Sequence, residues 1–320
     1  MVNYYIKENS RITSSTSLAQ LNELSYDEVL WIDMISPTAE ERGMVEEFLN
    51  INLQTQQQAE EIESSSRYYE TENTLYANTS FLLANKEHEL SSEQVSFILC
   101  EGVLVSIRPL GLRAFNETIR RLYANHRLYP TCFHVMVSIL ESRIDIDADM
   151  LEALAKEVTI INKQPFEDKS EIRLDSKLLL TINRLQENTM MMRESIIDKQ
   201  RVVSSILKSD RFPSDTTPKL NIIIKDISSL VSYADFAFER LEFLQDTVMG
   251  LISLEQNKVI KIFTVATVVF MPPTLISSIY GMNFHAMPEL TWRFGYPFAL
   301  MLMVLSVGII LVFFRMRKML

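Results

Sequence analysis

Two uncharged stretches near the C-terminus decide the fold: Ile262 to Tyr280, IFTVATVVFMPPTLISSIY, and Phe294 to Phe314, FGYPFALMLMVLSVGIILVFF. They contain 19 and 21 residues. As helices they are about 28 and 31 Å long, close to the thickness of the hydrocarbon core of a bilayer. The two stretches therefore predict two transmembrane helices. Pro272, Pro273 and several Thr and Ser side chains in the first stretch indicate that it faces partner helices or a pore, where freed backbone groups find partners.

Basic residues flank the two stretches on one side of the predicted membrane. Lys258 and Lys261 precede the first stretch and three basic residues follow the second, whereas the connecting loop, residues 281–293, contains one Arg, one Glu and one His. This bias predicts that both termini are cytoplasmic and that the loop lies outside. The first ten residues, MVNYYIKENS, lack the basic region and apolar core of a signal peptide, so we expect most of the chain in the cytoplasm.

Charge separates the same two parts of the chain. Residues 258–320 hold six Lys or Arg and one acid, so the other 25 basic and 40 acidic residues lie in residues 1–257, which carry a formal charge of −15. So acidic a chain is not expected to bind nucleic acid, which needs clustered Lys and Arg. The two cysteines, Cys100 and Cys132, are too few for a disulfide framework or a zinc site, and we expect them to be reduced core residues.

Short β-rich runs in the first 108 residues predict a small α/β domain. Strands are expected at residues 29–34, 65–72, 74–85, 94–100 and 103–108. Glu101-Gly102 joins the last two and is typical of a two-residue hairpin turn. A helix is expected to start at Pro37, with acids in its first turn.

Long helices are expected beyond this domain, because residues 112–249 contain no glycine and apolar residues recur at every third or fourth position. From Lys219 to about Ile279 the pattern predicts one helix of about 60 residues and about 90 Å. A rod of this length cannot bury its apolar face alone, so copies of the chain are its simplest neighbours. Asp145, Asp147 and Asp149 imitate the start of a calcium loop but lack its Gly and Glu, and a solvated helix face or a helix start is expected there.

The loop between the two stretches carries the most specific motif. It reads YGMNF at residues 280–284 and MPEL at 287–290; NKVIKIF precedes the first stretch, which contains FMPPTL, and WRFGYP opens the second. Together these motifs resemble the CorA family of magnesium channels over residues 255–320, and the order of elements is similar along the rest of the chain. The resemblance implies an α+β membrane protein that assembles as a homopentameric funnel. Its parts would be a cytoplasmic α/β domain at residues 1–110, long cytoplasmic helices and a stalk continuous with the first transmembrane helix at 111–258, and a two-helix pore module with the GMN loop at 259–320.

The resemblance also implies roles for single residues. The selectivity filter would comprise Gly281, Met282 and Asn283, with Glu289 as the acid of the loop. The pore-lining residues would be Asn257, Ile260, Phe263, Met271 and Thr274. Many relatives carry an acid after GMNF, where this chain has His285. Asp226, in the stalk stretch KDISSL, is the candidate for binding regulatory Mg²⁺.

The chemistry of Mg²⁺ gives the motif a physical reason. The ion holds six waters tightly and loses them reluctantly. A ring of Asn283 amides and Gly281 carbonyls could bind the hydrated ion through neutral oxygens, without a fixed charge that would trap it. Gly281 is expected to permit the backbone turn at which the helix ends.

The expected function is passive entry of Mg²⁺ through the bacterial inner (plasma) membrane, driven by about 4.6 kcal/mol per ion per 100 mV. Intracellular Mg²⁺ would gate the channel, and Co²⁺ or Ni²⁺ could also pass. Mg²⁺ is then both cargo and regulator, and the partners are further copies and membrane lipid. Two alternatives stay open: a Zn²⁺ transporter of the same superfamily, and a membrane-anchored coiled-coil scaffold that transports nothing. The sequence shows no nucleotide loop or catalytic motif, so an enzyme is not expected.

Overall fold

The computed structural model describes residues 1–8, 11–55, 58, 67–85, 89–167, 176–282, 287–288 and 292–317. The strands are β1 (Val2–Glu8), β2 (Arg11–Ser15), β3 (Val29–Ile35), β4 (Tyr68–Glu70), β5 (Thr74–Ala84), β6 (Leu90–Cys100) and β7 (Val103–Arg108). The helices are α1 (Leu18–Leu21), α2 (Ala39–Leu49), α5 (Arg113–Ala124), η1 (His126–Leu128), α6 (Cys132–Glu167), α7 (Ser176–Lys208), η2 (Ser214–Thr216), α8 (Thr217–Tyr280) and α10 (Gly295–Met316). They form two compact units, Met1–Gln245 and Asp246–Leu320.

Seven strands form one mixed sheet in the order β2-β1-β3-β7-β6-β5-β4. Only the central pair, β3 and β7, is parallel among the pairings described. The predicted hairpin between β6 and β7 is confirmed: Cys100 pairs with Val103, and Glu101 and Gly102 both have positive φ, 47° and 81°. That conformation defines the two-residue turn whose twist matches the strands it joins.

The structure corrects three local predictions. β1 and β2 form an N-terminal hairpin that the sequence analysis did not predict. β6 begins at Leu90 rather than Gln94, because its backbone keeps pairing with β5 as far as Ala84. α2 begins at Ala39 rather than Pro37, because the Thr38 hydroxyl accepts the Glu41 backbone N–H and the Glu41 side chain accepts that of Thr38, a capping box.

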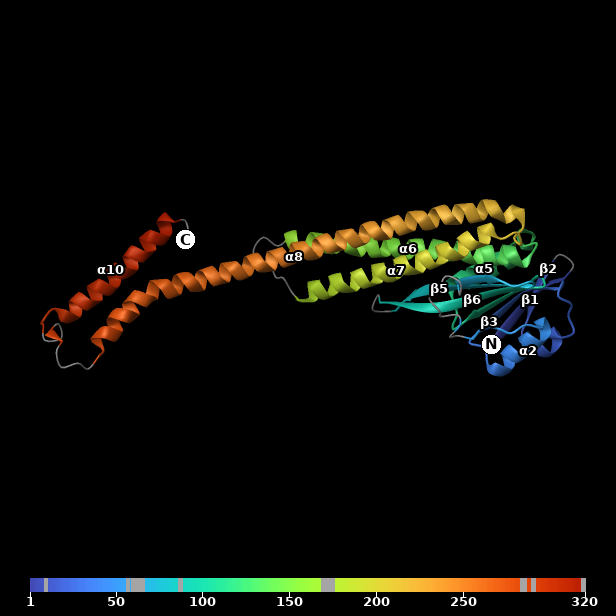
Figure 1. Cartoon of the computed structure of the whole chain (residues 1–320), viewed down its shortest axis with the longest axis horizontal. Helices are drawn as coiled ribbons and strands as arrows, with labels where there is room; N and C mark the ends of the chain where they lie inside the picture. The colour runs from blue at the N-terminus through green and yellow to red at the C-terminus, as the bar shows by residue number, and fades with distance from the viewer. Residues whose placement is uncertain are drawn as a thin grey trace. The chain divides into compact units, whose positions relative to one another are not determined.

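Helices cover both faces of the sheet (Figure 1). On β7, Leu104 belongs to one core, and Val103 and Val105 to a second. The core around Leu104 is shared with α5, α6, α7 and the first part of α8, whereas the second core is shared with α1 and α2. Because successive side chains of a strand point to opposite faces, this alternation places the long helices on one face and the short ones on the other. The predicted boundaries at residues 110 and 258 stay predictions.

A buried ion pair joins β3 to β7. Arg108 donates to both carboxylate oxygens of Asp33, at 3.0 and 2.7 Å, and the two residues are 2% and 0% exposed. The Ser106 hydroxyl donates to Asp33 at 2.8 Å and accepts the indole N–H of Trp31 at 2.8 Å. The guanidinium of Arg108 also lies 4.4 Å from the ring centre of Phe115 on α5. A carboxylate in this position is stable only because each of these donors is present.

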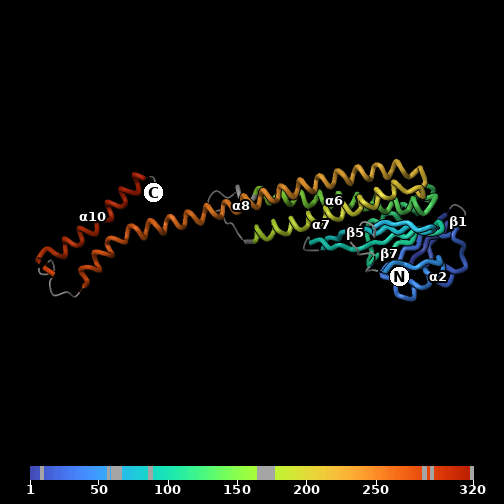
Figure 2. Tube along the Cα trace, in the orientation of Figure 1, coloured from blue at the N-terminus to red at the C-terminus, as the bar shows by residue number. Residues whose placement is uncertain are grey.

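The helices α6, α7 and the first part of α8 lie side by side over the sheet (Figures 1 and 2). Ion pairs join them: Glu157 with Arg184 at 3.2 Å, and Glu141 with Lys219 at 3.0 Å. The prediction of one uninterrupted helix from Lys219 is confirmed, since α8 runs for 64 residues, with Pro272 and Pro273 inside it.

The expectation of a solvated face at Asp147 is wrong. Asp147 and Lys199 are both fully buried, and their charged groups are 3.2 Å apart. Arg143, 3% exposed, also contacts Asp147 and donates to the Leu82 carbonyl of β5 at 2.9 Å. The Lys199 ammonium donates to the Ser195 carbonyl at 3.1 Å. This buried charge cluster ties α6 and α7 to β5, which fixes the register of the long helices on the sheet.

Arg108→Met should strongly destabilise the fold, because it leaves the buried Asp33 charge without its partner. We expect a loss of about 3–5 kcal/mol, the usual cost of breaking a buried pair. Urea unfolding of the full chain in detergent, followed by circular dichroism, measures it. The matched control is Arg113→Met, whose pair with Glu117 is largely exposed at 66% for the Arg side chain; its stability should stay close to that of the wild type, because an exposed ion pair contributes little. Equal losses for the two variants would contradict a specific role of the buried pair.

Lys199 should make the stability of the chain depend on alkaline pH. Burial, partly opposed by the Asp147 charge, lowers the pKa of Lys199 to about 8, whereas the unfolded value is about 10.4. Between these values the unfolded chain holds a proton that the folded chain has released, so stability from this group rises with pH. Relative to Lys199→Met, the wild type should therefore gain up to about 1.4 kcal/mol per pH unit between pH 8 and 9.5.

Urea unfolding of both proteins at pH 7, 8, 8.75 and 9.5 tests this. Lys156→Met is the control, because Lys156 is exposed beside Glu152, and its difference from the wild type should stay flat over the same range. A flat difference for Lys199→Met as well would show that Lys199 does not titrate in this window.

Candidate functional site

α8 and α10 are the two described helices that are long and apolar enough to cross a membrane (Figure 1). No residue in the most apolar 18-residue window of α8 is buried within the chain. The five predicted pore residues, Asn257, Ile260, Phe263, Met271 and Thr274, are all on the C-terminal half of α8 and all exposed. Phe263 is 69% and Met271 62% exposed. Apolar side chains at such exposure need lipid or further protein to cover them.

The hydroxyl of Thr274 is oriented by the helix itself. Its Oγ1 donates to the Phe270 carbonyl at 2.8 Å, which uses its only proton. The lone pairs of the oxygen remain, so an exposed Thr274 presents an acceptor to water or to a hydrated cation. A ring of such oxygens can bind the water shell of an ion without carrying charge.

The end of α8 explains the glycine of the motif in a different way from the one predicted. Of the described glycines only Gly102 has positive φ, so Gly281 is not required for a left-handed turn. Its N–H donates to the Ser277 carbonyl at 3.0 Å, and a Cβ at position 281 would lie only 3.1 Å from that same oxygen. Gly281 therefore permits a close backbone approach at the helix end. Met282, 46% exposed, follows it.

Two predicted site residues, Asn283 and Glu289, lie outside the described residues, as does His285. Their proposed roles therefore rest on the sequence.

α10 begins beside an aromatic group. The Trp292 ring meets the rings of Phe294 and Phe298 edge-on, with ring centres 6.2 and 5.8 Å apart. Arg315 and Arg317 lie at the other end of the helix. Aromatic residues at one end of an apolar helix and basic residues at the other are typical of a membrane span.

Asp226 lies exposed on α8, in the unit that contains the sheet. Burial, the charge of Glu141 and, to a smaller extent, those of Asp226 and Asp149 raise the pKa of Asp145 on α6. The acids of α6 and α8 are thus close enough to repel one another. In the described part of a single chain, no three acid, His or Cys side chains are placed to hold a metal ion.

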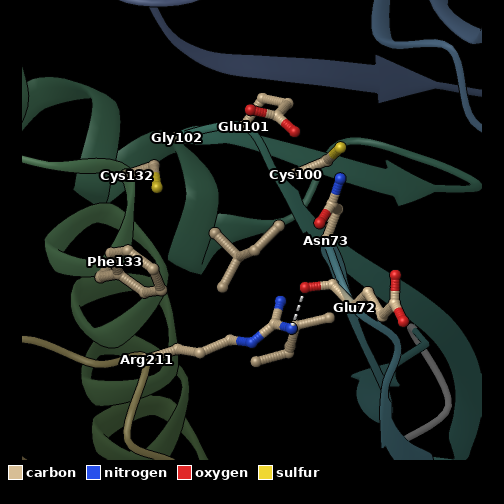
Figure 3. A pocket seen from close by; sticks show the side chains of 10 residues that line it. Glu72, Asn73, Cys100, Glu101, Gly102, Cys132, Phe133 and Arg211 are labelled. Carbon is tan, nitrogen blue, oxygen red and sulfur yellow. Dashed lines mark hydrogen bonds between the residues drawn. The ribbon is translucent and has the colours of Figure 1, made fainter.

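A cavity of about 390 Å³ lies beside the β6–β7 turn and contains both cysteines (Figure 3). Arg211 reaches across it and donates to the Glu72 carbonyl at 2.7 Å. Burial raises the pKa of Cys132 to about 12 and also raises the pKa of Cys100, so both are thiols rather than reactive thiolates. The prediction that the two cysteines are core residues is confirmed, since both are buried. Arg211 connects the loop after β4 to the segment between α7 and η2.

Comparisons with known proteins agree with this arrangement. A family model described as CorA-like Mg²⁺ transporter protein matches residues 26–317. The chain is 36% identical over 322 residues to the magnesium transport protein CorA of Wolinella succinogenes, with 99% of each chain covered. It also resembles two solved structures. The CorA magnesium transporter from Methanocaldococcus jannaschii gives a TM-score of 0.79 at 18% identity, covering 98% of this chain and 97% of that one. The ZntB cytoplasmic domain from Vibrio parahaemolyticus gives 0.57 at 15% identity, covering 78% and 97%.

The full-length match confirms the coarse architecture that the resemblance implied: an N-terminal α/β domain, a long helix and apolar C-terminal helices. Proteins of this family are transporters rather than enzymes. The match to the family model over most of the sequence and the near-complete coverage by a relative above 30% identity lead to one conclusion: the chain belongs to the CorA-like Mg²⁺ transporter family.

Proposed function

We propose that this chain is one subunit of a homopentameric channel that lets Mg²⁺ enter the cytoplasm through the bacterial inner membrane. The observation that carries the proposal is the C-terminal half of α8, a helix long enough to span a bilayer whose apolar window is wholly unburied and which ends at the GMN motif. Relatives that match 96–99% of the chain are named magnesium transport proteins. Both termini, and the unit with the sheet, would be cytoplasmic because basic residues flank both spans on that side.

Several copies supply what one chain lacks. Ile260, Phe263 and Met271 are exposed, and lipid tails could cover them on one helix. The polar Asn257 and Thr274, exposed on the same stretch, favour a water-filled axis instead. A closed ring of α8 helices places polar groups toward water and leaves α10 to face lipid. Five is the number implied by the family resemblance.

The motif at the end of α8 would select the ion. Five Asn283 amides and five Gly281 carbonyls form a ring of neutral oxygens that fits hydrated Mg²⁺, and Met282 stiffens this turn. Glu289, the single acid of residues 258–320, would raise the cation concentration near the entrance. His285 would make that attraction depend on pH near neutrality, since a protonated histidine repels cations.

Below the filter, polar and apolar rings would alternate. Thr274 offers a second ring of oxygens, oriented by its hydrogen bond to Phe270. Met271, Phe263 and Ile260 form apolar rings that exclude water when narrow, and Asn257 forms a polar exit. The membrane potential drives entry, so no hydrolysis of ATP is needed.

The identity of the ion rests on the relatives and not on the fold. A likeness to the ZntB domain at 15% identity shows that a related fold occurs in a protein of a different name. Co²⁺ and Ni²⁺ form hydrated dications of similar size and are proposed as minor cargo. Zn²⁺ is the alternative to Mg²⁺, and direct comparison of fluxes separates them.

Asn283→Ala should abolish Mg²⁺ flux into proteoliposomes while leaving the assembly intact, because it removes the amide oxygens that bind the hydrated ion. Native mass spectrometry in detergent should give about five times the chain mass of 37.0 kDa for wild type and variant alike. Asn221→Ala, which removes an exposed amide elsewhere on α8, is the matched control and should transport normally. Wild-type flux through Asn283→Ala would falsify the selectivity role, and a monomeric wild type would contradict the pore itself.

Mg²⁺ would also regulate the channel from inside. In five copies, residues 1–257 together carry a formal net charge of about −75, five times the −15 of one chain. Their repulsion falls when divalent ions lie between facing carboxylates, with Asp226 as one ligand. Bound Mg²⁺ then favours the closed arrangement, and its loss shifts the population toward the open one.

Millimolar Mg²⁺ should therefore protect the purified channel from limited proteolysis, and Asp226→Asn should weaken the protection. The rate of loss of the full-length band on a gel measures both effects. Glu23→Gln, an exposed acid next to α1, is the control and should behave like the wild type. If Mg²⁺ leaves the rate of cleavage of the wild type unchanged, regulation by this route is refuted although transport can stand.

A further inference from the structure

The five predicted pore residues leave a gap on α8. Phe263 and Met271 are eight residues apart, about 12 Å along the helix axis. Hydrated Mg²⁺ would have to pass more than two helical turns between two apolar rings. Some other side chain of α8 must face the axis within this interval.

Helix geometry identifies it. Each residue of an α-helix advances about 100° around the axis. Relative to Thr267, Phe263 and Met271 then lie about 40° to either side, while Ile260 and Thr274 lie within about 20°. Thr267 is therefore near the centre of the face that these four residues share, whereas its neighbour Val268 is turned about 100° away. Asn257, ten residues before Thr267, lies about 80° from it, so the shared face is the one between residues 260 and 274.

The chemistry of Thr267 matches that of Thr274. It is exposed, and its Oγ1 donates to the Phe263 carbonyl at 2.8 Å, the same contact that Thr274 makes with Phe270. The proton is used within the helix, so lone pairs of the oxygen are left for water. The other hydroxyl between Phe263 and Met271, that of Thr264, lies about 60° from Thr267 and donates to the Ile260 carbonyl at 2.8 Å.

We propose that Thr267 forms a further cation-binding ring in the ion path, midway between the Phe263 and Met271 rings, which accepts hydrogen bonds from the water shell of a hydrated divalent cation. This proposal rests on the pore described under Proposed function. It divides the 12 Å apolar interval into two steps of about 6 Å. An ion can then keep its waters bonded to protein at each step, which lowers the barrier that a dry apolar tube would impose.

The test replaces only the hydroxyl. Thr267→Val keeps the volume of the side chain and should lower Mg²⁺ flux into proteoliposomes about tenfold, the effect of losing roughly one hydrogen bond to the passing ion. Thr267→Ser retains the oxygen and should stay within about twofold of the wild type. Two matched controls move the hydroxyl instead: Val268→Thr should conduct normally, and Thr267→Val with Val268→Thr should not restore flux, because position 268 faces away from the axis.

A second readout does not depend on transport. In Mg²⁺-free buffer, a hydrophilic thiol reagent should label Thr267→Cys but not Val268→Cys, as measured from the mass of the transmembrane peptide; the buried Cys100 and Cys132 provide a low background. Normal flux through Thr267→Val, or equal labelling at the two positions, overturns the proposal. If the wild type carries no Mg²⁺ and Thr267→Cys is nevertheless labelled selectively, the Thr267 ring stands and the proposed cargo is wrong.

Discussion

One helix has to satisfy two solvents, and the rest of the structure follows from that constraint. In residues 217–245 of α8, an apolar stripe that includes Leu220, Ile223 and Ile227 packs into the core shared with the sheet. Between Lys261 and Tyr280 the helix has no charged side chain. None of the residues in its most apolar window is buried. The first part obeys the rule for a helix on a water-soluble core, and the second the rule for a helix in lipid.

Charge is handled in opposite ways in the two parts. In the unit with the sheet, Asp33, Arg108, Asp147 and Lys199 are buried, and each has a partner of opposite charge within 3.2 Å. Such pairs stabilise one arrangement of helices on the sheet, because moving either partner strands a charge. The proposed pore uses neutral oxygens instead, since a fixed charge there would hold the ion rather than pass it.

Much of this architecture could be predicted from local pattern. Apolar runs without charge identified both spans, the lack of glycine predicted the long helices, and Glu101-Gly102 predicted the turn whose positive φ values the structure shows. The N-terminal hairpin was missed, although Val2, Tyr4 and Ile6 alternate, because both strands are short and β1 is fixed in the sheet by pairing with β3 as well as with β2. Asp147 was misjudged for the same reason: its partner Lys199 lies 52 positions away, on α7, and spacing within α6 cannot reveal it.

The candidate site also had a part that local pattern could predict and a part that it could not. The position of Thr267 on the proposed pore-lining face follows from helix geometry alone, although none of the motifs includes it. The reason for a glycine at position 281 depends on the three-dimensional structure. A Cβ there would lie only 3.1 Å from the carbonyl oxygen of Ser277. Which residues of five chains meet at a filter cannot be read from one chain, since the ring is a property of the assembly.

The pair Pro272-Pro273 inside α8 has a mechanical consequence. Proline has no N–H, so the carbonyls of Val268 and Val269 lose the bonds that positions four residues later would normally give them. The helix therefore has fewer backbone hydrogen bonds next to Met271 than it has elsewhere. The helix is thus easiest to bend at the level of the proposed constriction. A bend there can change the bore of the ring by a small rotation, while the helix on either side stays stiff.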